Sequence, residues 1–152
     1  ALTENVAIQT WIARQFPAAA LLPEDPMDNV RALSVMAWCA SGIHPRITQQ
    51  SRPERFCDLE GSATNVQALG STGMFEQFAI ADQMLAARTW FFDSFSCADA
   101  YFYWCFRRGS SFAPDVSGFT NCVAHKKRME QRPSVQKLIA FEAQVRAHFA
   151  RA

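Results

Sequence analysis

Apolar residues recur at steps of three and four along most of the chain, which is the spacing of one face of an α-helix. Over residues 4–16 this spacing predicts a helix that Thr3 caps and that Pro17 ends, because proline interrupts helical hydrogen bonding. Its apolar face comprises Ile8, Trp11, Ile12 and Phe16. The stretch that follows, AAALLPEDPMD, contains two closely spaced prolines and is predicted to be an irregular connector.

A second helix is predicted to begin near Asp28 and to run over 28–42. Its apolar stripe comprises Val30, Leu33, Met36, Ala37 and Ala40. Gly42 is expected to end it, since glycine readily takes the left-handed conformation that stops a helix. The next stretch, HPRITQQSRPERF, is punctuated by proline and is predicted to be irregular.

Further helical patterns occupy the rest of the chain. A long helix is predicted over 65–90, although Gly70 and Gly73 each weaken it by up to about 1 kcal/mol relative to alanine. Helical spacing returns over 97–108 and 119–130, with the loop GSSFAPDVSG between them. The last helix starts at Pro133, where a missing amide donor does least harm. No run of four to eight residues alternates apolar with polar, so the sequence predicts an all-α fold.

Composition and charge are those of a soluble globular protein. The 152 residues are sufficient for one well-packed domain, and 49% of them are hydrophobic. The 15 basic and 14 acidic residues leave a formal net charge of +1, so nucleic acid is not an expected partner. No apolar stretch reaches the roughly 20 residues needed to cross a bilayer, and we expect no membrane partner. The chain begins with ALTENV and without an initiator methionine, which is consistent with a processed or partial polypeptide.

The cysteines and histidines indicate neither disulfides nor a metal site. The 5 cysteines form an odd set without a C-x-x-C pair, and the 3 histidines do not stand at zinc-ligand spacing to them. We therefore expect reduced thiols, a cytoplasmic location and no bound metal. Cys39 and Cys97 are expected to be buried and inert, since no basic neighbour that would lower a thiol pKa is readable from the sequence.

Ser96 and Asp99 stand three residues apart in the aromatic-rich stretch RTWFFDSFSCADAYFYWCFRRG. This spacing is typical of a capping box, in which the hydroxyl accepts from the Asp99 amide and the carboxylate accepts from the Ser96 amide. The alternative is a catalytic Ser/Asp pair, which needs a histidine within reach. No histidine is near in sequence, so we interpret the pair as the start of a helix.

Three segments together resemble one protein family. FSCADAYFYW resembles the S-x-A-D capping-box signature of the sixth helix of the cytosolic glutathione transferases. ENVAIQTWIARQFP…LLPED is similar to their segment E-S-x-A-I-x-x-Y-L-A…P…L-L-P, and RPSVQKLIAFE is similar to the start of a bacterial-type closing helix. The order of these motifs, spread over nearly the whole chain, favours a bacterial, beta-class-like member.

The resemblance implies a two-domain protein. Residues 1–17 would be the last helix of a thioredoxin-like domain that is largely missing here, 18–27 a linker, and 28–152 the all-helical C-terminal domain. The tyrosine, serine or cysteine that activates glutathione in the family has no counterpart in these residues. The fragment alone is therefore expected to be inactive.

The resemblance also implies a glutathione site. The family's acidic residue and serine that bind the γ-glutamyl end of glutathione fall on Glu4 and Asn5, so the serine is replaced. The alternative is that Thr3, Glu4 and Asn5 only cap a helix. His44 matches a histidine close to the glutathione sulfur in beta-class members, as an auxiliary catalytic group, but Pro45 stands where they have lysine. The alternative for His44 is an exposed loop residue.

The second substrate would be a small hydrophobic electrophile. Trp38 and the aromatic set Tyr101, Phe102, Tyr103 and Trp104 could line its pocket, although an apolar stripe is more often core. By the same resemblance, Arg108 stands where beta-class members usually have a pocket tryptophan. This replacement indicates either a more polar, anion-tolerant substrate site or a solvated helix end.

The preferred hypothesis is a glutathione transferase in which the thiolate of glutathione attacks the electrophile, or a related glutathione-dependent reaction, with a role in detoxification. A homodimer is expected from the family. The alternative is a non-catalytic helical interaction module of the same fold.

Overall fold

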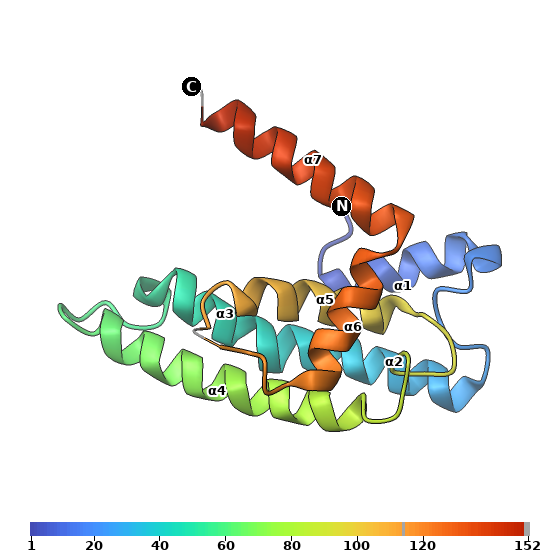
Figure 1. Cartoon of the computed structure of the whole chain (residues 1–152), viewed down its shortest axis with the longest axis horizontal. Helices are drawn as coiled ribbons and strands as arrows, with labels where there is room; N and C mark the ends of the chain where they lie inside the picture. Colours follow the sequence, from blue (N-terminus) through green and yellow to red (C-terminus); the bar gives the residue numbers. More distant parts are fainter. Residues whose placement is uncertain (114, 151–152) are drawn as a thin grey trace.

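The computed structural model describes residues 1–113 and 115–150 of the chain. Over these ranges it forms helices and no strand, which confirms the all-α prediction (Figure 1). The α-helices are α1 (Asn5–Gln15), α2 (Pro26–Trp38), α3 (His44–Ser51), α4 (Ala63–Met84), α5 (Cys97–Ser110), α6 (Thr120–Glu130) and α7 (Pro133–Phe149). Short helical turns lie between them: η1 (Pro17–Ala19), η2 (Cys39–Ile43) and η3 (Pro53–Arg55).

Helix α5 is the centre of the bundle and contacts α1, α2, α3 and α6. Its rings Phe102 and Phe106 are fully buried, and Phe106 meets Phe78 of α4 edge-on with ring centroids 4.8 Å apart. Full burial of one such side chain contributes about 1.5–3 kcal/mol. The aromatic run therefore forms mainly core. Its packing also fixes the orientation of the opposite side of α5, which the other helices do not cover.

The segment after α2 departs from the sequence prediction. Gly42 does not end a helix: the chain passes through the π-helical turn η2 directly into α3, so the prediction of an irregular stretch was wrong over His44–Ser51. A proline ring clashes with the carbonyl four residues earlier, and a widened turn before Pro45 relieves that clash. Gly42 instead allows a close approach, since a Cβ there would lie 2.9 Å from the Trp38 ring.

Helix α4 is shorter than predicted, since it ends at Met84 rather than near 90. The chain then turns through Ala87, which has a positive φ of 56°. Gly70 and Gly73, which weaken the helix locally, are both buried at its contact with α3. A Cβ on Gly73 would lie 2.7 Å from Nε of Arg46, so these glycines let the two helices approach closely.

Two helix starts also differ from prediction. Helix α1 has Glu4 at its N-cap without a side-chain capping bond, so Thr3 does not cap it. Helix α2 begins at Pro26, because the Asp25 carboxylate accepts from the amides of Met27 and Asp28, each at 2.9 Å. The capping box of Ser96 and Asp99 is present at the start of α5, as predicted.

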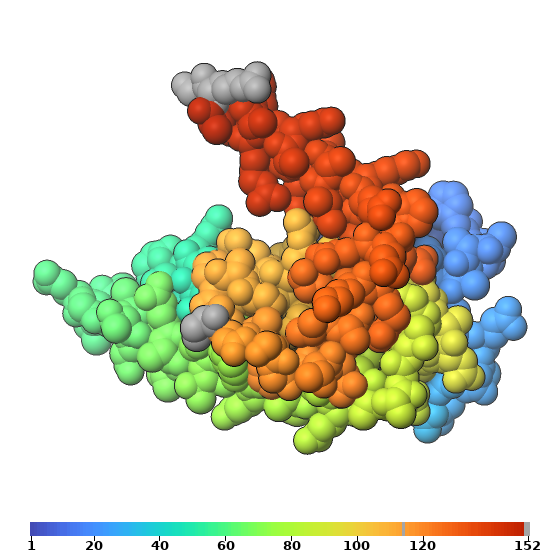
Figure 2. Space-filling view, viewed as in Figure 1, coloured from blue at the N-terminus to red at the C-terminus, as the bar shows by residue number. Residues whose placement is uncertain are grey.

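Helix α7 stands away from the bundle, as Figures 1 and 2 show. Only Val135 of this helix is buried, and an ion pair between Arg107 of α5 and Glu142 ties its middle to the body. Leu138, Phe141 and Phe149 stay exposed. None of the helices in the described residues is long and apolar enough to cross a membrane.

Candidate functional site

Three residues that the sequence singled out separately meet at one point of the structure. Tyr101 of α5 lies between the start of α1 and the start of α3. Its hydroxyl is 3.4 Å from Nδ1 of His44, although the two residues are 57 positions apart in sequence. The side chain of Asn5 lies close enough to Tyr101 to lower the pKa of its phenol. Asn5, Tyr101 and His44 therefore form one polar cluster, which we call the tyrosine cluster.

Burial sets the protonation of the tyrosine cluster. Partial burial lowers the pKa of His44 from its usual 6.5, because an imidazolium is poorly solvated there. Burial also raises the pKa of Tyr101, an effect that the neighbouring Asn5 side chain partly offsets and that the nearby Glu4 carboxylate reinforces. Near neutral pH the cluster thus holds an uncharged imidazole and a protonated phenol, so it can both donate and accept hydrogen bonds.

The backbone at Glu4, next to this cluster, is strained. Glu4 has φ 68° and ψ 124°, outside the left-handed helical region that a non-glycine residue occasionally adopts. Such a conformation costs about 1–3 kcal/mol and is often found at ligand sites. No side chain caps α1 at Glu4, and the side-chain oxygen Oδ1 of Asn5 accepts from Nε2 of Gln9. The first-turn amides of α1 therefore have no side-chain acceptor and are available to a ligand. The alternative, in which Thr3, Glu4 and Asn5 only cap the helix, would have occupied them.

A pocket of about 340 Å³ opens beside the cluster, between α3, η3 and α5. His44, Trp104 and Arg108 line it, as do Arg52 and Arg55. The His44 and Trp104 rings lie 4.7 Å apart and are tilted by 54°. Sequence reasoning identified Arg108 and the aromatic set but missed Arg52 and Arg55, whose only signal was the basic, proline-containing stretch predicted to be irregular.

The other aromatic candidates lie elsewhere. Trp38 points toward α4, where its indole Nε1 donates to Oε1 of Gln77 at 2.6 Å. It lies in neither the tyrosine cluster nor the pocket beside it. Phe102 is fully buried in the main core, and Tyr103 packs with Met129 in a smaller core at the α6 end. Of the aromatic set, Tyr101 and Trp104 face the site.

A histidine of α6 lies within hydrogen-bond distance of Asp99, although none is near Ser96 and Asp99 in sequence. Nε2 of His125 lies 3.0 Å from the Asp99 carboxylate, and all three side chains are buried. The carboxylate sits between the other two, and the Ser96 hydroxyl donates to it at 3.1 Å. In a catalytic triad the histidine would be in the middle and accept the serine proton. The arrangement here instead joins α5 to α6.

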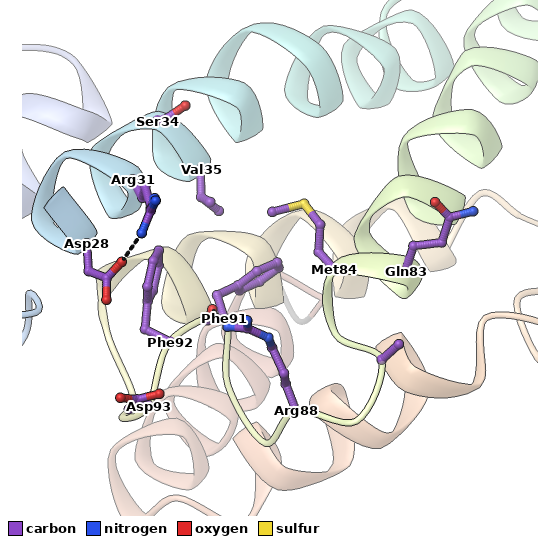
Figure 3. Close-up of a pocket in the computed structure, with 11 residues that line it drawn as sticks. Asp28, Arg31, Ser34, Val35, Gln83, Met84, Arg88, Phe91, Phe92 and Asp93 are labelled. Atoms are coloured by element: carbon purple, nitrogen blue, oxygen red, sulfur yellow. Dashed lines mark hydrogen bonds and ion pairs between the residues drawn. The ribbon is translucent and has the colours of Figure 1, made fainter.

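A larger pocket, about 800 Å³, lies away from the tyrosine cluster. It is bounded by the start of α2, the end of α4 and the loop after it; Figure 3 shows Phe91, Phe92 and the ion pair of Asp28 with Arg31 on its walls. None of the residues predicted from the sequence lines it. Size alone therefore does not locate the site.

Four of the five thiols are buried, whereas Cys57 is partly exposed and hydrogen bonding to Ser62 lowers its pKa. All five cysteines are free, and burial raises the pKa of Cys97 to about 11 and that of Cys105 well above its usual range. Cys39 and Cys97 are buried, as predicted. Over residues 1–113 and 115–150 no group of three or more His, Cys, Asp or Glu side chains is placed to hold a metal ion.

Comparison with known proteins identifies the fold. No protein-family profile matches the sequence, and no curated protein is significantly similar to it. Among solved structures, a glutathione transferase homolog from Sulfitobacter, with bound glutathione, has a TM-score of 0.86 at 22% identity, covering 93% of this chain and 68% of that chain. A beta-class glutathione S-transferase from Sphingomonas chungbukensis has a TM-score of 0.80 at 29% identity, with the same coverage.

A glutathione S-transferase from Xylella fastidiosa has a TM-score of 0.84 at 25% identity, covering 93% of this chain and 70% of that chain. The chain is therefore similar over nearly all its length to bacterial glutathione transferases, and its fold matches their C-terminal helical domain. It spans about two thirds of the length of these relatives.

Proposed function

We propose that the complete protein is a glutathione transferase and that this chain supplies one side of its active site. The observation that carries the proposal is the tyrosine cluster: Asn5, Tyr101 and His44 come from three different helices and meet beside the strained backbone of Glu4. Similarity to relatives solved with glutathione supports glutathione as the co-substrate. The shared fold by itself would not identify the co-substrate, since one fold hosts many functions.

Each residue has a distinct role in this proposal. The first-turn amides of α1 and the side chains of Glu4 and Asn5 bind the γ-glutamyl end of glutathione, where a helix N-terminus favours a carboxylate and Glu4 pairs with the ammonium. His44, neutral near pH 7, accepts a hydrogen bond from the thiol and so favours the thiolate. The thiolate forms a carbon–sulfur bond with an apolar electrophile as the leaving group departs with its electron pair. The thiol proton passes to solvent.

The proposal includes a thioredoxin-like domain before this chain. Residues 1–17 would then be its last helix, 18–27 a linker and 28–152 the electrophile-site domain. Trp11 and the neighbouring Ile8 and Ile12 of α1 are exposed here, and the rest of the thioredoxin-like domain would bury them. The main thiolate-activating residue would come from that domain. A homodimer, a cytoplasmic location and a role in detoxification belong to the same proposal, as does a chain inactive on its own.

The test uses the full-length protein. Isothermal titration with glutathione measures binding, and conjugation of 1-chloro-2,4-dinitrobenzene measures turnover. We expect Asn5→Ala to weaken glutathione binding and His44→Ala to lower kcat/KM by at least about tenfold, in line with the lower range for positioned acid–base groups. His148→Ala, in the exposed end of α7, is the matched control and should change neither value.

If the full-length protein neither binds glutathione nor conjugates the electrophile, it is not a transferase. The alternative of a non-catalytic interaction module, which the replacements at Asn5 and Pro45 favour, would then stand.

A further inference from the structure

The pocket beside Trp104, between α3, η3 and α5, is unusually basic. It is lined by three arginines, Arg52, Arg55 and Arg108, and by no aspartate or glutamate. Among the described residues none of these three guanidinium groups has a carboxylate within ion-pair distance. By contrast, Arg31 pairs with Asp28 at 2.8 Å, and Arg107 and Arg146 both pair with Glu142. Three uncompensated cations at one concave surface attract an anion.

The two hydroxyls that line the pocket already donate to backbone carbonyls. The Thr48 hydroxyl donates to the His44 carbonyl and the Ser51 hydroxyl to the Ile47 carbonyl, each at 3.1 Å. These bonds turn both hydroxyls back onto α3. The arginines are the charged donors that line the pocket, and a guanidinium fork matches a carboxylate or sulfonate in geometry as well as charge.

Trp104 adds a flat apolar surface to the same pocket. It is 39% exposed, and His44 packs against it with ring centroids 4.7 Å apart. Arg108 lies one helical turn further along α5, on the same face, and its guanidinium is held over the Phe112 ring at 4.6 Å. The indole face and the Arg108 cation therefore lie on the same face of α5, and His44 of the tyrosine cluster packs against the indole.

We propose that this pocket binds the anionic group of a flat aromatic electrophile, a carboxylate or sulfonate, whose ring lies against Trp104. The proposal rests on the function proposed above and deepens it by naming the substrate class. Its volume, about 340 Å³, suits a single small aromatic molecule. With the anion at Arg52, Arg55 and Arg108, the other end of the ring points toward His44, where the glutathione sulfur is proposed to lie.

The binding test compares two fluorescent probes with similar aromatic bodies. 8-Anilinonaphthalene-1-sulfonate carries a sulfonate, whereas N-phenyl-1-naphthylamine is neutral. We expect Arg108→Gln in the full-length protein to weaken binding of the sulfonate probe about tenfold, the usual value for one charge-assisted hydrogen bond, and to leave the neutral probe unchanged. Arg55→Gln should act in the same direction, which guards against a folding defect specific to Arg108. Arg31→Gln, which removes a paired arginine of the other pocket, is the matched control.

The kinetic test compares 4-chloro-3,5-dinitrobenzoate with neutral 1-chloro-2,4-dinitrobenzene. The ratio of their kcat/KM values should fall in Arg108→Gln and Arg55→Gln and stay constant in Arg31→Gln. High salt should lower the ratio as well, since it screens a partly exposed site.

Three results separate the possibilities. Sulfonate binding that ignores the arginine variants overturns the proposal. Displacement of the sulfonate probe by glutathione, lost in Arg108→Gln, also overturns it, because the arginines would then hold the peptide's own carboxylate. If the protein does not bind glutathione yet the probe results hold, the transferase function fails while the anion pocket stands.

Discussion

At the scale of single residues, Asp99 illustrates how a local signal acquires a second role in the folded chain. Its two carboxylate oxygens accept from the Phe91 amide at 3.1 Å, from Nε2 of His125 at 3.0 Å, and from the Ser96 amide at 2.9 Å. A cap that starts α5 therefore also fastens the preceding loop and α6. A buried carboxylate is tolerated only when its hydrogen bonds are satisfied in this way.

We expect Asp99→Asn to lower the free energy of unfolding by about 3 kcal/mol, because it breaks a buried charged interaction and turns an amide NH₂ toward donors. Urea denaturation measures this change. Asp28→Asn, which breaks an exposed pair with Arg31, should cost about 0.5 kcal/mol or less. Equal losses in the two variants would contradict a special role for Asp99.

His44 should make stability depend on pH. Since burial lowers its pKa below the usual 6.5, the folded chain binds fewer protons than the unfolded chain below that value. The free energy of unfolding should therefore fall as the pH drops from about 6.5 through the lowered pKa of the folded state. His44→Gln should show a smaller fall, measured by urea midpoints at neutral and mildly acidic pH. An identical pH profile in both proteins would show that His44 is not buried as described.

At the scale of helices, small residues decide how closely the elements approach. Gly109 near the end of α5 faces α4, and a Cβ there would lie 2.6 Å from Cζ of Phe78 and 2.8 Å from Sδ of Met74. Phe78 cannot move aside easily, since it is fully buried and packs against the rings of Phe106 and Phe119. The contact between α4 and α5 thus depends on the missing side chain.

Gly109→Ala should accordingly lower the free energy of unfolding by about 1–3 kcal/mol through overpacking, despite the better helix propensity of alanine. Thermal or urea unfolding would measure it. Gly118→Ala is the matched control, because an added Cβ there meets nothing within 4 Å and the expected change is within about 0.5 kcal/mol. A stabilised Gly109→Ala protein would show that the contact is looser than the structure indicates.

At the scale of the whole molecule, apolar surface concentrates on the outer sides of α1 and α7. Trp11 is 54% exposed, and Phe141 and Phe149 of α7, the helix that projects from the body in Figure 2, are exposed too. Large exposed rings of this kind commonly mark interaction surfaces. The thioredoxin-like half and the dimer in the function proposed above would account for such surfaces.

Trp11→Glu distinguishes the isolated chain from the full-length protein. In the isolated chain the substitution should change the free energy of unfolding by less than about 0.5 kcal/mol, because the ring is largely in water. In the full-length protein it should cost about 2 kcal/mol or more, since a charge would be buried against the second domain. Leu59→Glu, at a position 73% exposed and far along the chain from α1, should be neutral in both. A neutral Trp11→Glu in both proteins would argue against the covering domain.

The sequence predicted helix existence well and helix limits less well. The capping box at Ser96 and the proline start at Pro133 were predicted correctly, since both signals act within one helical turn. Gly42 and Pro45 gave a wrong prediction, because both are usually helix breakers. Here a π-helical turn accommodates the proline, and Gly42 packs closely against Trp38 and α4. The candidate site was predicted as separate residues, of which Trp38 lies apart.

By itself the sequence determined the all-helical class, the local helix starts and the buried thiols, because these depend on periodicity, capping and hydrophobicity over a few residues. Only the tertiary structure decided that Asn5, Tyr101 and His44 meet, that His125 pairs with Asp99, and that Arg52 and Arg55 join Arg108 in one pocket. Such meetings depend on the packing of helices distant in sequence. No local pattern encodes them.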